Sequence, residues 1–246
     1  MNEDKYSDEE LKSIINESIS EFRKLMNREP DSRKYLPDPD RFRYLHEFEN
    51  SDKVRGGILI AGLNPHIGAN EDEMIWRKKY EIDGIRNTSD KLLREYRYFK
   101  RFTAKIKEGD FVEKYNMDLQ QIDSNVKFTD IVLIRSEGKH ELMKSISGEE
   151  DRKLGKAIEI GWEHHLSKLL KLVRPKVMVC NSVDLSNFLE SNFSSDGSKN
   201  QNDIISLEMD DCKIPCVLSG QVTGQRATDK WALIRMRKAI EITLRK

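Results

Sequence analysis

Residues 56 to 66 read GGILIAGLNPH, a short apolar run that stops abruptly at Asn64, Pro65 and His66. The apolar and β-branched composition of this run predicts a buried strand over residues 58–63. Asn and Pro are ordinary turn residues, so the strand is expected to end before them. Parallel sheets place their ligand sites beyond the carboxyl ends of the strands, which makes this turn a candidate site.

Three further segments share the short, apolar pattern of a buried strand, at residues 126–134, 176–180 and 215–218. Helical patterns flank or separate the strands, at residues 89–106, 153–172, 183–193 and 229–245. Strands that alternate with crossover helices predict an α/β fold. We expect three layers, α/β/α, around a short, mostly parallel four-stranded sheet.

The first 50 residues are predicted to form a helical extension packed on an α/β domain that spans residues 51–246. Ser7 and Glu10 fit a capping box at the start of a helix that should run to about Met26. The apolar residues of this segment recur at helical spacing, as expected for a helix that covers a core.

The composition favours a globular protein and argues against several classes of function. Charged residues make up 35% and hydrophobic residues 37% of the chain, and no apolar run approaches the roughly 20 residues that span a bilayer. We therefore expect a cytoplasmic monomer with no membrane partner. The three cysteines form no CxxC pair and the histidines lack metal-ligand spacing, so neither a metal nor another cofactor is expected. His164 and His165 are expected to be surface or core residues.

The loops after the four strands should meet at one edge of the sheet. They comprise residues 64–66, 135–138, 181–182 and 219–226. None contains a dinucleotide fingerprint, and the chain has no GxxxxGK[ST] phosphate loop and no GxSxG elbow. Nucleotide-triphosphate hydrolysis and serine-hydrolase chemistry therefore rank last.

Three ordered pieces of the sequence resemble the uracil-DNA glycosylase superfamily over roughly residues 54–245. Residues 60–65, IAGLNP, are similar to the first motif of the family, closest to the Gly-Met-Asn-Pro form of its single-strand-selective branch. Residues 128–135, FTDIVLIR, resemble the second strand motif, and residues 175–180, PKVMVC, resemble the strand before the final catalytic loop. The resemblance implies a DNA partner and an enzyme that flips out a base and hydrolyses its N-glycosidic bond.

The resemblance also implies roles for the residues of the first loop. Asn64 would position the attacking water and Pro65 would pin the loop, while His66 would line the mouth of a base pocket next to Gly62. Trp76 is a candidate platform on which the flipped base stacks. Two alternatives remain open, a plain strand-ending turn at residues 64–65 and a core position for Trp76.

The last motif of the family, His-Pro-Ser, is absent, because residues 219–221 are Ser, Gly and Gln. The histidine of that motif donates to the base oxygen on which negative charge collects. Gln221 or Arg226 is a candidate for this role, and Arg226 is favoured because a fixed cation matches developing negative charge. The same departure leaves open a catalytically inactive relative that only binds nucleic acid.

Asp130 occupies the position where uracil-specific members place an asparagine that reads the pyrimidine edge. An asparagine amide accepts from N3–H and donates to O4 of uracil, whereas an ionised carboxylate only accepts. A carboxylate suits the exocyclic amine of cytosine, and a protonated Asp130 can donate to N3 of that base. The resemblance therefore favours cytosine or a modified cytosine as the excised base. An ion pair with Arg135, or a backbone cap, is an equal alternative for Asp130.

Sequence-independent contacts with DNA are predicted for basic residues on one helical face and for one residue after the last loop, namely Arg94, Arg97, Arg101, Lys105 and Lys230. The chain has 43 basic and 43 acidic residues, so such binding depends on local patches. A solvated surface with no partner is the alternative for these cations.

Overall fold

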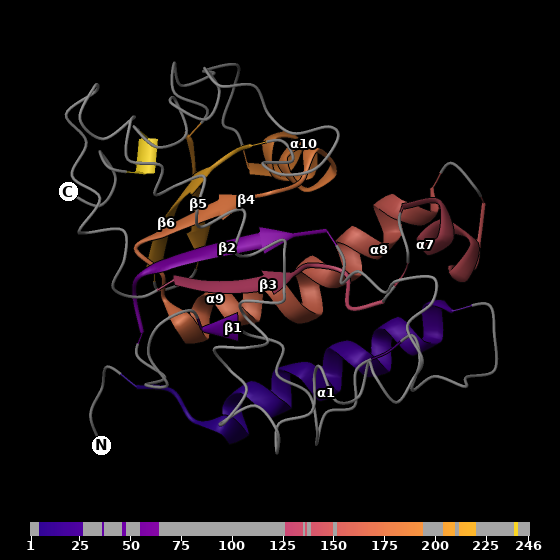
Figure 1. Ribbon diagram of the computed structural model, residues 1–246, viewed down its shortest axis with the longest axis horizontal. Coiled ribbons are helices and arrows are strands. Elements are labelled where there is room, and N and C mark those ends of the chain that lie inside the picture. The colour runs from indigo at the N-terminus through magenta and orange to yellow at the C-terminus, as the bar shows by residue number, and fades with distance from the viewer. Residues whose placement is uncertain are drawn as a thin grey trace.

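The computed structural model describes residues 5–26, 36, 46–47, 55–63, 126–134, 136, 139–149, 152–193, 204–209, 212–219 and 239–240. The described residues form a six-stranded sheet in the order β1-β3-β2-β4-β6-β5 (Figure 1). The strands are β1 (His46–Glu47), β2 (Ile58–Gly62), β3 (Val126–Asp130), β4 (Val177–Cys180), β5 (Ile204–Met209) and β6 (Cys212–Val217).

The four central strands, β3, β2, β4 and β6, are parallel to one another. The short β1 pairs antiparallel with β3, and β5 pairs antiparallel with β6. This arrangement confirms the predicted α/β class and its parallel four-stranded centre. It also brings the carboxyl ends of the four central strands to one edge of the sheet.

Three of the four predicted strands match the observed strands within a few residues, and the fourth is shorter than predicted. The predicted strand at 126–134 ends at Asp130, although residues 131–134 stay fully buried. Burial without strand geometry explains the difference, because apolarity reports that a segment is buried and not how its backbone is paired. The edge strand β5 was not predicted, although its apolar residues alternate with Ser206 and Glu208 over residues 205–209, as in a strand with one buried face.

The helices of the described region connect the central strands. One continuous helix is formed by α8 (Lys153–Gly161), a π-helical turn η1 (Trp162–Leu166) and α9 (Ser167–Val173), and α10 (Val183–Phe193) follows β4. These helices confirm the predictions at 153–172 and 183–193. The short α7 (Lys139–Ser145) was not predicted. The predicted helix at 89–106 lies outside the described residues, as does most of the one at 229–245, of which Ala239 and Ile240 are helical.

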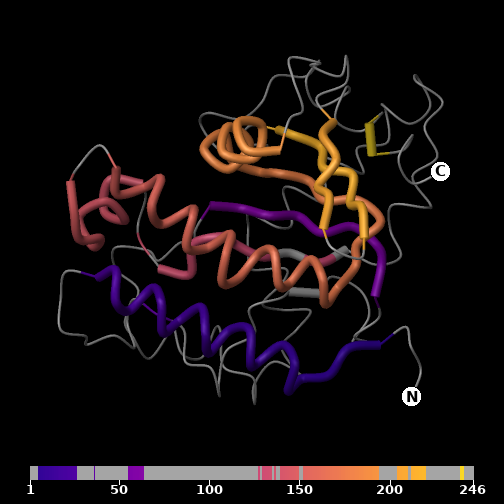
Figure 2. Tube along the Cα trace, turned by 180° about the vertical axis from the view of Figure 1, so that it is seen from behind, coloured from indigo at the N-terminus to yellow at the C-terminus, as the bar shows by residue number. Residues whose placement is uncertain are grey.

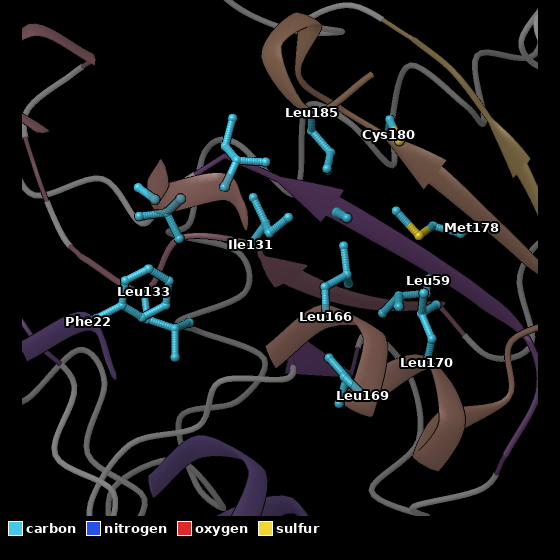
Figure 3. Close-up of a cluster of buried hydrophobic side chains, with 14 of the residues drawn as sticks. Phe22, Leu59, Ile131, Leu133, Leu166, Leu169, Leu170, Met178, Cys180 and Leu185 are labelled. Carbon is cyan, nitrogen blue, oxygen red and sulfur yellow. The ribbon is translucent and has the colours of Figure 1, made fainter. Parts of the chain in front are cut away.

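Both faces of the central sheet are buried. On one face, Leu59 and Met178 share a core with leucines of η1, α9 and α10, and Figure 3 shows Leu166, Leu170 and Leu185 among them. The alternate residues of β2 and β4 point to the other face and are 0–2% exposed, namely Ile58, Ile60, Val177 and Val179. A parallel sheet covered on both faces is the arrangement that the continuous apolar runs predicted.

Helix α1 (Asp8–Leu25) packs on the continuous helix, on the side away from the sheet (Figures 1 and 2). Its predicted capping box is confirmed: the Ser7 side chain accepts from the Glu10 amide at 3.1 Å, and Glu10 accepts from the Ser7 amide at 2.8 Å. Phe22, a residue of this helix, is fully buried. The predicted division at residue 50 stays a prediction, because most residues from 27 to 54 lie outside the described part.

Candidate functional site

The carboxyl ends of β3, β2 and β4 lie side by side and are tied together by backbone hydrogen bonds. Gly62 is the register partner of Asp130 in the parallel ladder. Beyond that pair, the Ile131 amide donates to the Gly62 carbonyl at 3.0 Å. On the other side of β2, the Asn181 amide donates to the Ala61 carbonyl at 2.8 Å. The carboxyl ends of these three strands, where the site is expected, are therefore fixed relative to one another.

The backbone pairing continues one residue past β2. The Val132 amide donates to the Leu63 carbonyl at 2.8 Å, so Leu63 is held to the segment that follows β3. Asn64 is the next residue in the chain and lies outside the described residues. The anchored Leu63 nevertheless means that the predicted first loop departs from the sheet directly beside Asp130.

Asp130 is the last residue of β3 and is partly exposed at this edge. Removal from water raises the pKa of its carboxyl to about 7. Near neutral pH the group is thus present both as a carboxylate, which only accepts hydrogen bonds, and as a carboxylic acid, which donates one and accepts one. Among the described residues, no cation forms an ion pair with Asp130. Arg135, its alternative partner from the sequence, lies outside the described part.

Gly62 and Asp130 are the two predicted site residues that the structure describes, and it brings them together as register partners. The other predicted residues lie outside the described part, namely Asn64, Pro65, His66, Trp76, Arg94, Arg97, Arg101, Lys105, Gln221, Arg226 and Lys230. Their roles stay predictions.

Ser186 of α10 holds the start of the predicted last loop and was missed in the sequence. Its hydroxyl donates to the Ser219 carbonyl at 2.8 Å, and the Ser219 amide donates to the same hydroxyl oxygen at 3.2 Å. Ser219 is two residues before Gln221, so this pair of bonds fixes where the loop leaves β6. The signal in the sequence was a serine next to Leu185 on the face of α10 that also buries Leu189.

His165 of η1 lies in the core behind β3. Its Nε2 is 3.0 Å from the Thr129 hydroxyl oxygen, and its Nδ1 has no hydrogen-bond partner among the described residues. Burial lowers the pKa of His165 to about 4, so the ring is neutral at physiological pH. Its neighbour His164 lies nearer the surface, where its Nδ1 is 2.9 Å from the carboxylate of Glu17.

The cysteines of the sheet do not form a catalytic or metal site. Cys180 and Cys216 are buried with their sulfur atoms 3.5 Å apart, and the contact with Cys180, together with burial, raises the pKa of the Cys216 thiol well above its usual range. A thiol that resists ionisation is a poor nucleophile and a poor metal ligand. Within the described ranges, no three or more His, Cys, Asp or Glu side chains gather as metal ligands, and no helix has the length and apolarity to cross a membrane.

No protein-family model matches this chain, and no curated protein matches it significantly. The likeness to the uracil-DNA glycosylase superfamily therefore rests on the three short motifs alone. What the structure adds is geometric: residues 60–62 of the first motif and residues 128–130 of the second lie on neighbouring parallel strands and pair in register.

Proposed function

We propose that this protein is a cytoplasmic DNA glycosylase that flips a pyrimidine out of DNA and hydrolyses its N-glycosidic bond. The observation that carries the proposal is the pairing of Gly62 with Asp130, which sets the start of the Asn64 loop beside a carboxyl group of altered pKa. A group with a strongly shifted pKa at the carboxyl edge of a parallel sheet is a common mark of a binding site.

In the proposed reaction the bond between C1′ of the sugar and N1 of the base breaks, and its electron pair leaves with the base. A water held by Asn64 adds to C1′ and gives up a proton, and the departing base takes up a proton. Arg226 or Gln221 stabilises the negative charge that develops on the base. The products are the free base and an abasic sugar, and no cofactor is required.

The pKa of Asp130 bears directly on which base is bound. As a carboxylate, Asp130 accepts from the N4 amine of cytosine and repels O4 of uracil. As a carboxylic acid, it matches cytosine by donating to N3 while accepting from N4, and it also matches uracil by donating to O4 while accepting from N3–H. A pKa near 7 therefore favours cytosine above neutral pH and admits uracil below it.

The test is base release from oligonucleotides that contain uracil, cytosine, 5-methylcytosine or 5-hydroxymethylcytosine, followed by alkaline cleavage of abasic sites, at pH 6 and pH 8. We expect release of a cytosine base at both values, loss of activity in Asn64→Ala, and a shift toward uracil at pH 8 in Asp130→Asn. Glu208→Gln, at an exposed ion pair with Lys213, is the matched control and should behave as wild type. Absence of abasic product from every oligonucleotide would refute the enzymatic proposal.

A second candidate, a glycosylase-like protein that binds nucleic acid without cleaving it, is favoured by the missing His-Pro-Ser motif. It predicts salt-dependent DNA binding that Asn64→Ala leaves unchanged. Replacing Arg97 and Arg101 by alanine should reduce the slope of log affinity against log salt by up to about 2 if both contact phosphates. Such binding without base release would decide for this candidate.

A further inference from the structure

The continuous helix from Lys153 to Val173 contains one π-helical turn next to the candidate site. Within this turn the Ser167 amide donates to the carbonyl of Trp162, five residues back, instead of four. A π turn has poorer geometry than an α turn and is frequent at functional sites. The surrounding contacts indicate what this one does.

On its inner side the helix contacts the chain immediately before and immediately after Asp130. Before it, Thr129 lies 3.0 Å from His165, and the two side chains are 1% and 0% exposed. After it, Gly161 meets the backbone of Ile131 so closely that a Cβ at residue 161 would lie 2.1 Å from the Ile131 carbonyl oxygen. Asp130 is thus held between two anchors that come from a single helix.

The anchors do not occupy the space in front of the Asp130 side chain. Successive side chains of a strand point to opposite faces, so Asp130 and Thr129 lie on different faces of β3. The helix therefore acts on the backbone of β3 from behind the site. Gly161 and His165 are four residues apart and lie on one face of the helix, toward Ile131 and Thr129, while His164 lies nearer the surface beside Glu17.

The Nδ1 of His165 has no hydrogen-bond partner in the described part of the chain, which argues against a role in packing alone. A buried ring nitrogen with no partner costs its desolvation free energy, and an apolar side chain of similar size would fill the same space without that cost. The hydroxyl contact with Thr129 is what the imidazole provides that a phenylalanine or leucine would not.

We propose that His165 and Gly161 are positioning residues, which hold the backbone on either side of Asp130 and so fix its carboxyl group at the ligand-binding edge of the sheet. This inference deepens the proposed function, because it concerns the residue that reads the base. Its test uses a property of the free protein, so that the two proposals fail separately.

The test is a pH titration of the Asp130 side-chain carboxyl by ¹³C NMR in the full chain, with the resonance assigned from its loss in Asp130→Asn. Thr129→Val keeps the shape of the side chain but removes the hydroxyl that contacts His165, and should loosen the backbone beside Asp130 and expose its carboxyl further to water. We expect its pKa to fall from about 7 toward the ordinary value of 3.8. Thr129→Ser keeps the hydroxyl and should retain the pKa of the wild type.

His165→Phe should lower the Asp130 pKa as Thr129→Val does, whereas His164→Gln, one residue away on the α1 side, should leave it unchanged. A contact that served only stability would lower the thermal midpoint of Thr129→Val without moving the Asp130 pKa, and that result overturns the inference. If His165→Phe does not fold, the pair Thr129→Val and Thr129→Ser still decides. A lowered pKa in Thr129→Val supports the inference whether or not the protein releases any base.

Discussion

Polar groups on the two sides of the η1 turn have opposite surroundings, paired on one side and desolvated on the other. On the outer side, α1 supplies a partner for each polar group: Ser18 donates to the His164 carbonyl at 2.8 Å, and the Glu17 carboxylate pairs with His164 and Lys168. These contacts, led by the hydrogen bond from His164, lower the pKa of Glu17. On the inner side, the buried ring of His165 is neutral at physiological pH because burial lowers its pKa, and the strand that it contacts ends at Asp130, whose carboxyl pKa is raised to about 7 by desolvation.

The difference separates a contact that joins two helices from the surroundings of a candidate site. Paired polar groups at the α1 contact favour their charged forms and add modest stability. Charged groups that are desolvated and have no ion partner among the described residues lower the stability of the fold. Groups with such shifted pKa values cluster at binding sites. Five predictions test this distinction, beginning with the largest effect.

Gly161→Ala should destabilise the protein most. The added methyl group would lie 2.1 Å from the Ile131 carbonyl oxygen and 2.9 Å from its carbonyl carbon, so backbone must move. We expect a loss of about 3 kcal/mol in the free energy of unfolding, measured with urea. Gly155→Ala in the same helix has nothing within 4 Å of the new Cβ and should be neutral or stabilise by about 0.5–1 kcal/mol. Equal effects at the two glycines would show that the helix does not press on β3.

Asp130→Asn should stabilise the protein above pH 7 and change it little near pH 4. The folded pKa of Asp130, about 7, lies above its ordinary value of 3.8, so its contribution to stability falls as pH rises through this window. Removing the carboxyl should raise the free energy of unfolding at pH 8 by about 2–4 kcal/mol relative to its effect at pH 4. Urea unfolding of both proteins from pH 4 to pH 8 measures this difference, and a difference that does not vary with pH would contradict the prediction.

The same titration should reveal His165 in the Asp130→Asn background. The folded pKa of His165, about 4, lies below its ordinary value of 6.5, so its contribution is complete above pH 6.5 and is lost as pH falls toward 4. The two groups oppose each other in the wild type. Without Asp130, stability should rise steadily between pH 4 and pH 6.5.

Ser18→Ala should cost about 1–2 kcal/mol, because it removes a buried hydroxyl that lies between the carbonyls of Ile14 and His164. Ser145→Ala is the matched control, since the Ser145 hydroxyl contacts only a carbonyl of its own helix, that of Glu141. Comparison of the two variants by chemical unfolding isolates the bond between α1 and η1. If Ser145→Ala cost as much, the interhelical bond would contribute nothing.

Glu17→Gln should have the smallest effect, below about 1 kcal/mol at low salt and close to zero at 1 M salt. The Glu17 side chain is 42% exposed, so water and ions screen its pairs with His164 and Lys168. Glu21→Gln, whose partner Lys24 is on the same helix, is the control for a local ion pair. A loss of stability that persists at high salt would show that the ion pairs of Glu17 are shielded from solvent, as His165 is on the inner side of η1.

The sequence predicted best those elements whose signals lie in residues close together in the chain. Helix α10 was predicted over its observed range, and the capping box of α1 was predicted from Ser7 and Glu10, because both signals depend on residues close together in the chain. The edge strand β5 was missed even though residues 205–209 alternate apolar and polar side chains, and its antiparallel pairing with β6 became visible only in the structure. For the site, the sequence predicted that Asp130 would lie near the first loop, and it gave no indication of Ser186.

The amino-acid sequence by itself determined the class of fold, because short apolar strands that alternate with amphipathic helices have few ways to bury their surfaces. It also indicated that Gly62 lies near the end of a strand, whereas it placed Asp130 within a strand predicted to run to residue 134, and only the structure ends that strand at Asp130. Only the tertiary structure decided the shifted pKa values of Asp130 and His165, since desolvation depends on neighbours far away in the chain. The structure alone also showed the π turn, the Gly161 contact and the opposite surroundings of His164 and His165. All three lie in a helix that packs against α1 on one side and against the segment around Asp130 on the other.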